Sequence, residues 1–222
     1  ITSPKWSRCA RLPPNPTILG FDTSAAHVAA AVVSGDLVLA DHFEDRPRGQ
    51  DEVLFGVLEN VLTKAKLAWA DLDGIAVGVG PGNFTGVRIS VAAAKGLGVS
   101  LGIPVRGVSG FEQALHLAPK GAAAAIIAPR GQFYVSEPRQ GKLCTAQEAA
   151  EILQYAKGLV GLGADALADQ TGIPFLQTMH AGMSTALLAA ADWGNDWGAV
   201  KPLYLKPADA APPRNPAPTI VP

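Results

Sequence analysis

The sequence predicts an α/β fold with two lobes, and three observations support the prediction. Short apolar stretches separated by tight turns occupy residues 17–44, which is typical of consecutive strands. An amphipathic helix, a buried strand and a second helix follow, so the order is β-β-β-α-β-α. A second series of strands and helices begins near residues 104–109, where the two lobes are expected to meet. This alternation is typical of layered α/β architectures.

The first lobe is expected to begin with three antiparallel strands. They are predicted at residues 18–23, 28–33 and 37–43, from the stretches "ILGFDT", "VAAAVV" and "LVLADHF". The tripeptide Ser34-Gly35-Asp36 is typical of a hairpin connection between the last two. Strands joined by such short turns pair antiparallel, because a parallel pair needs a long crossover connection.

Two helices and one buried strand complete the first lobe. The first helix, residues 51–67, has acidic residues in its first turn, where the helix dipole favours negative charge. The strand is expected at residues 72–80, and the second helix at residues 85–102, before Pro104. The first helix is predicted from the helical spacing of its apolar residues, which are Val53, Leu54, Val57, Leu58, Val61 and Leu62.

The second lobe is expected to contain four strands and several helices. A short strand and a helix capped by Ser109 come first, followed by strands in "AAAAIIAPR" and "QFYVSEP" that turn near Gly131. Thr145 and Glu148 have the spacing of a capping box, which predicts a helix start. A further strand and helical segments are expected in "GLVGLGADAL" and "MSTALLAAADW".

Composition suggests how the chain is divided. We expect a first lobe at residues 17–106 and a second, reduced lobe at residues 107–207. Residues 1–16 read as a disordered arm without the apolar segment of a secretory signal. Residues 208–222 are rich in Pro and Ala and read as a disordered tail.

Charge, cysteine content and hydropathy exclude several classes of protein. The formal net charge is −1, and all three charged residues of the arm are basic, so the folded body is acidic and forms no platform for nucleic acid. Cys9 and Cys144 lie too far apart in sequence to indicate a disulfide framework, which favours a reducing, cytoplasmic compartment. The longest apolar helical stretch, residues 89–103, contains Lys95 and is too short to cross a bilayer.

Asp22, Thr23 and Ser24 form the first group with possible chemistry. They end the first strand, where a turn can present a carboxylate and two hydroxyls to nucleotide phosphates and magnesium. The alternative is that the same side chains satisfy the backbone of the turn, which Asp, Ser and Thr often do. The sequence leaves both interpretations open.

The stretch "GVGPGNFTGVRIS", residues 78–90, is the second candidate. It lacks the Gly-Lys-Ser/Thr ending of a phosphate loop, and Asn83 stands where a dinucleotide fingerprint needs glycine. An anion at the helix start remains an alternative. We favour a conformational role, in which Gly82 and Gly86 permit close approach of the backbone and Asn83 or Thr85 caps the helix. Small residues farther along would let another helix approach, and Phe84 would be an exposed contact residue.

No catalytic or metal-binding constellation is expected. His27, His42, His116 and His180 are scattered without the spacing of metal ligands. No Gly-x-Ser-x-Gly motif occurs, and Cys144 has no motif context that would make it a nucleophile.

Three stretches together resemble the bacterial TsaB family, also called YeaZ. They are "ILGFDTSAAHVAAAV", "GVGPGNFTGVRISVAAAKGLGVSLGIPVRGVSGFEQAL" and "PLYLKPADA", and residues 80–89 contain the complete Gly-Pro-Gly-Ser/Asn-Phe-Thr-Gly-x-Arg-Ile signature. The resemblance covers about residues 17–210 and is strongest in the first lobe. It implies a two-lobed fold of the actin-like, Hsp70 and sugar-kinase (ASKHA) class, in which each lobe is a mixed sheet with flanking helices.

The resemblance also implies a function. Members of this family take part in forming threonylcarbamoyladenosine beside the anticodon of tRNAs that read codons starting with A. The implied role is non-catalytic: the protein dimerises with its catalytic paralogue TsaD, works with the ATPase TsaE, and forms a homodimer when TsaD is absent. It would meet tRNA only through the complex, and ATP or ADP with magnesium would bind only in the partner complex.

The resemblance places a docking surface on the two helices of the first lobe. Arg88 is otherwise expected on a solvated helix face, and it could pair with a carboxylate of the partner. The expected interface residues are Val53, Leu54, Val57, Gly82, Asn83, Phe84, Thr85, Gly86, Arg88, Ile89, Ala92, Ala93 and Gly96.

The sequence departs from the family pattern in two places, and the second departure, which removes an acidic residue, weakens a nucleotide site between the lobes. Gly49-Gln50-Asp51-Glu52 replaces a His-Ser-Glu-like element, and Ala128-Pro129-Arg130 replaces Asp-Ala-Arg. Because Pro129 cannot donate a ladder hydrogen bond, the strand before it should end by Ala128. Two alternatives to the accessory role stay open, a small kinase or ATPase that uses Asp22, Thr23 and Ser24, and a glycoprotease-like hydrolase.

Overall fold

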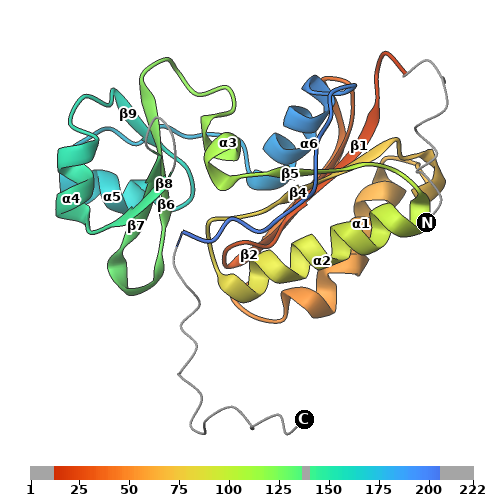
Figure 1. Cartoon of the computed structure of the whole chain (residues 1–222), viewed down its shortest axis with the longest axis horizontal. Coiled ribbons are helices and arrows are strands. Elements are labelled where there is room, and N and C mark those ends of the chain that lie inside the picture. Colours follow the sequence, from red (N-terminus) through yellow and green to blue (C-terminus); the bar gives the residue numbers. More distant parts are fainter. Residues whose placement is uncertain (1–12, 137–140, 206–222) are drawn as a thin grey trace, which may run out of the picture.

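The computed structural model describes residues 13–136 and 141–205, which form two mixed sheets with flanking helices (Figure 1). Thus Cys9, most of the predicted N-terminal arm and the predicted C-terminal tail at residues 208–222 lie outside the described residues. No helix within the described ranges is long and apolar enough to cross a membrane.

The larger sheet has five strands in the order β3-β2-β1-β4-β5. As predicted, β1, β2 and β3 pair antiparallel, and β4 and β5 then extend the sheet in parallel with β1. A helix joins β4 to β5, and another helix leads from β3 to β4, in agreement with the β-β-β-α-β-α order. The strands are β1 (Thr17–Asp22), β2 (His27–Ser34), β3 (Leu37–Asp45), β4 (Gly74–Gly78) and β5 (Val105–Val108).

Helices cover both faces of this sheet (Figure 1). On one face lie α1 (Gln50–Lys64) and α2 (Phe84–Leu101), which contact each other and bury the main hydrophobic core against the strands. A short 3₁₀ helix, η2 (Trp69–Asp71), follows α1. On the other face lies α6 (Ala181–Ala191).

The smaller sheet has four strands in the order β8-β7-β6-β9 and its own core. Its first strand ends at Ile127, directly before Ala128 and Pro129, which confirms the predicted stop. The Thr145–Glu148 capping box is also confirmed at the start of α4. The elements are α3 (Gly110–Leu115), β6 (Ala122–Ile127), η3 (Pro129–Gly131), β7 (Phe133–Ser136), β8 (Gly141–Cys144), α4 (Ala146–Ile152), β9 (Gly158–Val160) and α5 (Ala164–Thr171).

Two elements do not follow the expected division of the chain. The short strand expected to begin the second lobe is β5, which pairs with β4 of the five-stranded sheet, and one helix also joins that sheet. Helix α6 lies within residues 107–207, which we assigned to the second lobe, but it packs on β1 and β2 of the five-stranded sheet. The approach is close, because a Cβ atom on Gly182 would lie 2.6 Å from the backbone nitrogen of Ala30. An apolar helix pattern predicts that a helix is buried but carries no information about which sheet buries it.

Candidate functional site

The end of β1 holds a buried carboxylate whose hydrogen bonds come from within the protein. Asp22 is 0% exposed. Its Oδ1 accepts hydrogen bonds from the backbone N–H and the hydroxyl of Ser24, each at 2.7 Å, and lies 3.0 Å from Nε2 of His27. Its Oδ2 accepts a hydrogen bond from Nε2 of Gln113 at 2.9 Å. Both oxygens of the carboxylate therefore accept hydrogen bonds from groups of the protein.

These contacts keep Asp22 ionised. Burial by itself raises the pKa of the Asp22 carboxyl. The hydrogen bond and the charge of His27, with the hydrogen bonds from Gln113 and Ser24, outweigh burial and lower the pKa from 3.8 to about 2. The carboxyl group of Asp22 is thus ionised at neutral pH.

The two hydroxyls beside Asp22 are also engaged. Thr23 Oγ1 donates a hydrogen bond to the carbonyl oxygen of Gly86 at 2.8 Å, and Ser24 Oγ donates to Asp22. From α1, the side-chain amide of Gln50 lies within hydrogen-bonding distance of three carbonyl oxygens of the turn. This arrangement favours the turn-stabilising interpretation of Asp22, Thr23 and Ser24.

The glycine-rich stretch joins this turn to α2. Asn83 is the cap of α2, because its Oδ1 accepts hydrogen bonds from the backbone N–H groups of Thr85 and Gly86 at 2.9 and 3.4 Å. A Cβ atom on Gly82 would overlap the carbonyl oxygen of Ser24, and one on Gly86 would overlap that of Thr23. The two glycines therefore permit close packing of α2 on the turn, as the conformational interpretation predicted.

Part of the predicted interface is wrong, because it lies in the hydrophobic core. Leu54 is 1% exposed and Val57 is 8% exposed. Gly86 is buried, and Val53 and Ile89 are partly buried against the same core. Apolar residues at helical spacing mark the inner face of a helix, so the spacing selected residues that contact the sheet.

Other predicted interface residues do reach the surface, together with some that the sequence reasoning missed. Both Gly56 and Gly96 face open space, because a Cβ atom there would meet nothing within 4 Å. Phe55 is 48% exposed and Val99 is 86% exposed, and their position out of phase with the buried stripe is the signal that could have identified them. The exposed predicted residues are Asn83, Phe84, Thr85, Arg88, Ala92 and Gly96, while Gly82 and Ala93 are half-buried.

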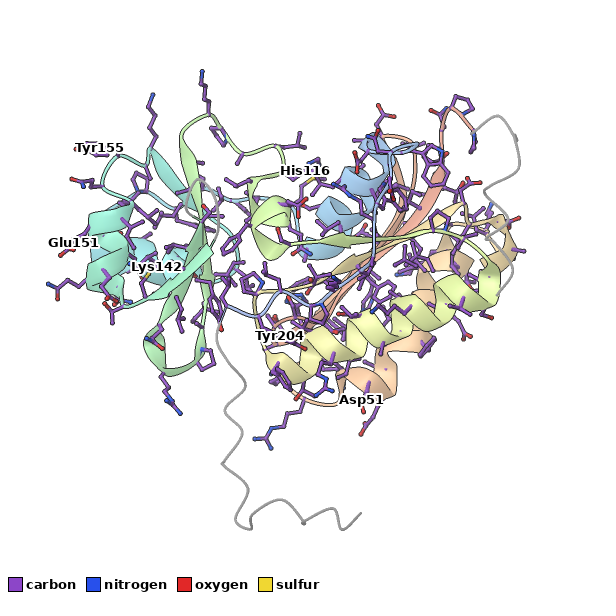
Figure 2. The ribbon with its side chains drawn as sticks, in the orientation of Figure 1. Asp51, His116, Lys142, Glu151, Tyr155 and Tyr204 are labelled. Carbon is purple, nitrogen blue, oxygen red and sulfur yellow. The ribbon has the colours of Figure 1, made fainter. Side chains whose placement is uncertain are left out.

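An aromatic cluster lies at the start of α2. Phe84 is 39% exposed, its ring centre lies 5.0 Å from that of Tyr204, and the guanidinium carbon of Arg88 lies 5.0 Å from the Phe84 ring centre. Tyr204 is found beside this end of α2 in Figure 2. It comes from the last described segment of the chain, and no local pattern links it to Phe84.

A cleft of about 210 Å³ lies between the two sheets. His27 and His180, distant in sequence, both line it and both contact the ring of Phe43, at 5.5 and 5.8 Å between ring centres. His180 caps α6, accepting a hydrogen bond at Nδ1 from the N–H of Met183, while its Nε2 lies 3.1 Å from Asp41. Within the described ranges, no group of three or more His, Cys, Asp or Glu is arranged to hold a metal ion.

The two mixed sheets and the cleft between them define the class of protein, a two-lobed α/β fold of the actin-like ATPase and sugar-kinase class. Solved structures share it. A Pseudomonas aeruginosa protein described as similar to peptidase YeaZ has a TM-score of 0.67 at 24% identity, over 86% of this chain and 100% of that one. An activator of 2-hydroxyisocaproyl-CoA dehydratase from Clostridium difficile, with bound ADPNP, has a TM-score of 0.53 at 11% identity, over 79% of this chain and 95% of that one.

Sequence comparison gives the family. Residues 47–191 match the family model described as TsaD, tRNA N6-adenosine threonylcarbamoyltransferase. The uncharacterised protein Rv3421c of Mycobacterium tuberculosis is 30% identical over 88% of this chain and 94% of its own length. The tRNA threonylcarbamoyladenosine biosynthesis protein TsaB of Escherichia coli is 34% identical over 54% of each chain. Other curated relatives are likewise matched over little more than half of their length. The chain belongs to the TsaB (YeaZ) family within this group of proteins, as its sequence signature predicted.

Proposed function

We propose that this protein is an accessory, non-catalytic subunit in the formation of threonylcarbamoyladenosine on tRNA. It would dimerise with a TsaD-type catalytic paralogue, work with a TsaE-type ATPase, and pair with a second copy when the paralogue is absent. The observation that carries the proposal is a group of exposed apolar or small residues on α1 and α2, which lie among the charged residues of the same surface. Relatives named for threonylcarbamoyladenosine biosynthesis support the choice of pathway.

We propose a docking surface made of exposed residues of these two helices. We call Phe55, Gly56, Ala92, Gly96 and Val99 the α1–α2 face; all five are exposed and none is polar. Gly56 and Gly96 have no side chain and face open space, so a partner helix could approach closely there. Phe55 would supply an aromatic anchor. A stable interface buries on the order of 1,600 Å² in total, which two adjacent helices on each side can supply.

The internal hydrogen bonds of Asp22, Thr23 and Ser24 support a non-catalytic role. To bind magnesium, Asp22 would have to exchange buried donors for the ion, and the hydroxyls would have to leave Gly86 and Asp22. We therefore propose that ATP or ADP with magnesium binds only in the partner complex, and that the partner holds the tRNA phosphates, since this chain has a net charge of −1. The location would be cytoplasmic.

The competing enzyme functions have less support. A kinase or ATPase would use Asp22, Thr23 and Ser24 to bind nucleotide and magnesium, but these side chains are engaged in hydrogen bonds within the protein. A hydrolase acting through Cys144 would need a reachable thiol, whereas that side chain is 1% exposed and its sulfur lies 3.6 Å from the carbonyl oxygen of Phe133.

Reconstitution tests the proposal. tRNA, threonine, bicarbonate and ATP are incubated with the TsaD-type and TsaE-type proteins, with wild-type chain, with Gly96→Trp, or without the chain. Modified tRNA is expected with the wild type but not with Gly96→Trp or without the chain. Gln147→Trp, at an exposed position of α4 on the other sheet, is the matched control and should support modification. Equal modification without the chain would refute the proposed role.

A further inference from the structure

A histidine that lines the cleft between the sheets has a buried ring nitrogen with no hydrogen-bond partner among the described residues. His27 is 4% exposed, its ring lines the cleft, and its Nδ1 is shielded from water without a partner among the described residues. We propose that this cleft binds a small, mostly apolar molecule carrying one hydroxyl or N–H donor, whose hydrogen bond Nδ1 of His27 accepts. The inference stands independently of the proposed tRNA-modification role.

The neighbouring carboxylate sets the tautomer of the ring. Asp22 is ionised and accepts a hydrogen bond from Nε2 of His27, so the neutral form of the ring carries its proton on Nε2. Nδ1 is then a lone-pair acceptor. A buried acceptor that lacks a donor is unfavourable, and a ligand that supplies the donor removes that cost. This points to a donor-bearing ligand over one that offers only acceptors.

The walls of the cleft define the rest of the ligand. Phe43 comes from the five-stranded sheet, Ile126 from the four-stranded sheet, and Phe175 and Met179 from the segment that leads to α6. These side chains are apolar or aromatic and suit a hydrocarbon or aromatic body. A volume of about 210 Å³ is below the usual range for drug-sized ligands, so the expected ligand is smaller than a nucleotide.

The segment from Phe175 to His180, which lines one side of the cleft, is fixed at both ends by contacts with the two sheets. Phe175 forms a bridge with Leu159 of β9, and His180 contacts Asp41 of β3. The backbone oxygen of His27 is in turn contacted by Gln50. A ligand can reach Nδ1 of His27 only if a neighbouring side chain moves. We expect this side chain to be Phe43, because it packs on the His27 ring and is 42% exposed.

Phenol and toluene are suitable probes, because they have nearly the same shape and only phenol has a donor. Titration of each into the ¹⁵N-labelled chain, followed by NMR, gives both affinity and the resonance of His27 Nδ1. Phenol is expected to bind about tenfold more tightly than toluene and to shift the Nδ1 resonance toward lower frequency. Equal affinities, or binding of phenol with an unchanged Nδ1 resonance, would overturn the proposal.

Two variants test whether the ligand binds in the cleft, and a third tests the role of His27. Leu162→Trp adds bulk at a cleft residue that is 41% exposed, and it should weaken phenol binding. Tyr155→Trp is the matched control, because Tyr155 is 88% exposed, lies outside the cleft lining and projects from the far side of the four-stranded sheet (Figure 2). His27→Phe should bind phenol and toluene alike. If it fails to fold, the Leu162 and Tyr155 variants still decide the question, and similar phenol affinity in these two would refute the site.

Discussion

Gln113 donates hydrogen bonds from one side-chain nitrogen to both Asp22 and Thr185, each at 2.9 Å, and so ties α3 to β1 and α6. All three residues are buried. Replacing Gln113 with Ala should lower the free energy of unfolding by about 1–3 kcal/mol, because a buried carboxylate loses a donor. Urea denaturation measures the loss. Gln170→Ala is the control: its amide bonds only within α5, and a change within about 0.5 kcal/mol is expected.

The Asp22 carboxylate should make folding sensitive to acid. Its pKa is lowered to about 2, so its contribution to stability is fully present above pH 3.8 and is lost as the pH falls toward 2. The loss should be on the order of 2 kcal/mol. Urea denaturation of wild type and Asp22→Asn between pH 7 and pH 2 checks this. The two stability curves should converge at low pH, and parallel curves would contradict the assignment.

Alanine substitutions at Leu54 and Phe55, two adjacent residues of α1, should have different effects on stability and on association. Leu54→Ala should lower the free energy of unfolding by about 2–5 kcal/mol, because Leu54 lies in the core. Phe55→Ala should leave stability almost unchanged but weaken association with the TsaD-type partner or with a second copy. Thermal denaturation and size-exclusion chromatography separate the two effects. Unchanged association in Phe55→Ala would remove the α1–α2 face from the interface.

Two glycines of α2 offer a matched pair for the role of close packing. Gly86→Ala should destabilise the protein, because the new Cβ would collide with the carbonyl oxygen of Thr23. Gly96→Ala places the same methyl group in open space and should stabilise the helix by up to about 1 kcal/mol. Thermal unfolding of both variants measures the contrast, and a melting temperature lowered equally in both would be inconsistent with it.

ATP with magnesium should bind weakly or not at all to the isolated chain, because the residues that would hold it are engaged in the β1–β2 turn. Isothermal titration calorimetry measures this directly, with Asp22→Asn as a second sample. Tight binding to the wild type that is lost in Asp22→Asn would favour the kinase or ATPase alternative.

Local features of the site were predictable from the sequence. Asn83 as the cap of α2, the Thr145–Glu148 capping box and the stop before Pro129 each depend on hydrogen bonds within a few residues. The antiparallel order of the first three strands follows from the short connections between them. The family signature lies in one continuous stretch, so it too could be recognised without the structure.

The predictions that failed concern which segments meet in space. Periodicity identified Leu54 and Val57 as one face of a helix, and the structure shows that this face packs on the sheet and is not free to bind a partner. In the same way, no local signal places α6 on the five-stranded sheet. The sequence by itself determined the elements and the family, because their signals act over short distances along the chain. The contact of Gln113 with Asp22 and the meeting of His27 with His180 at Phe43 were decided only by the tertiary structure, because they depend on how distant segments pack.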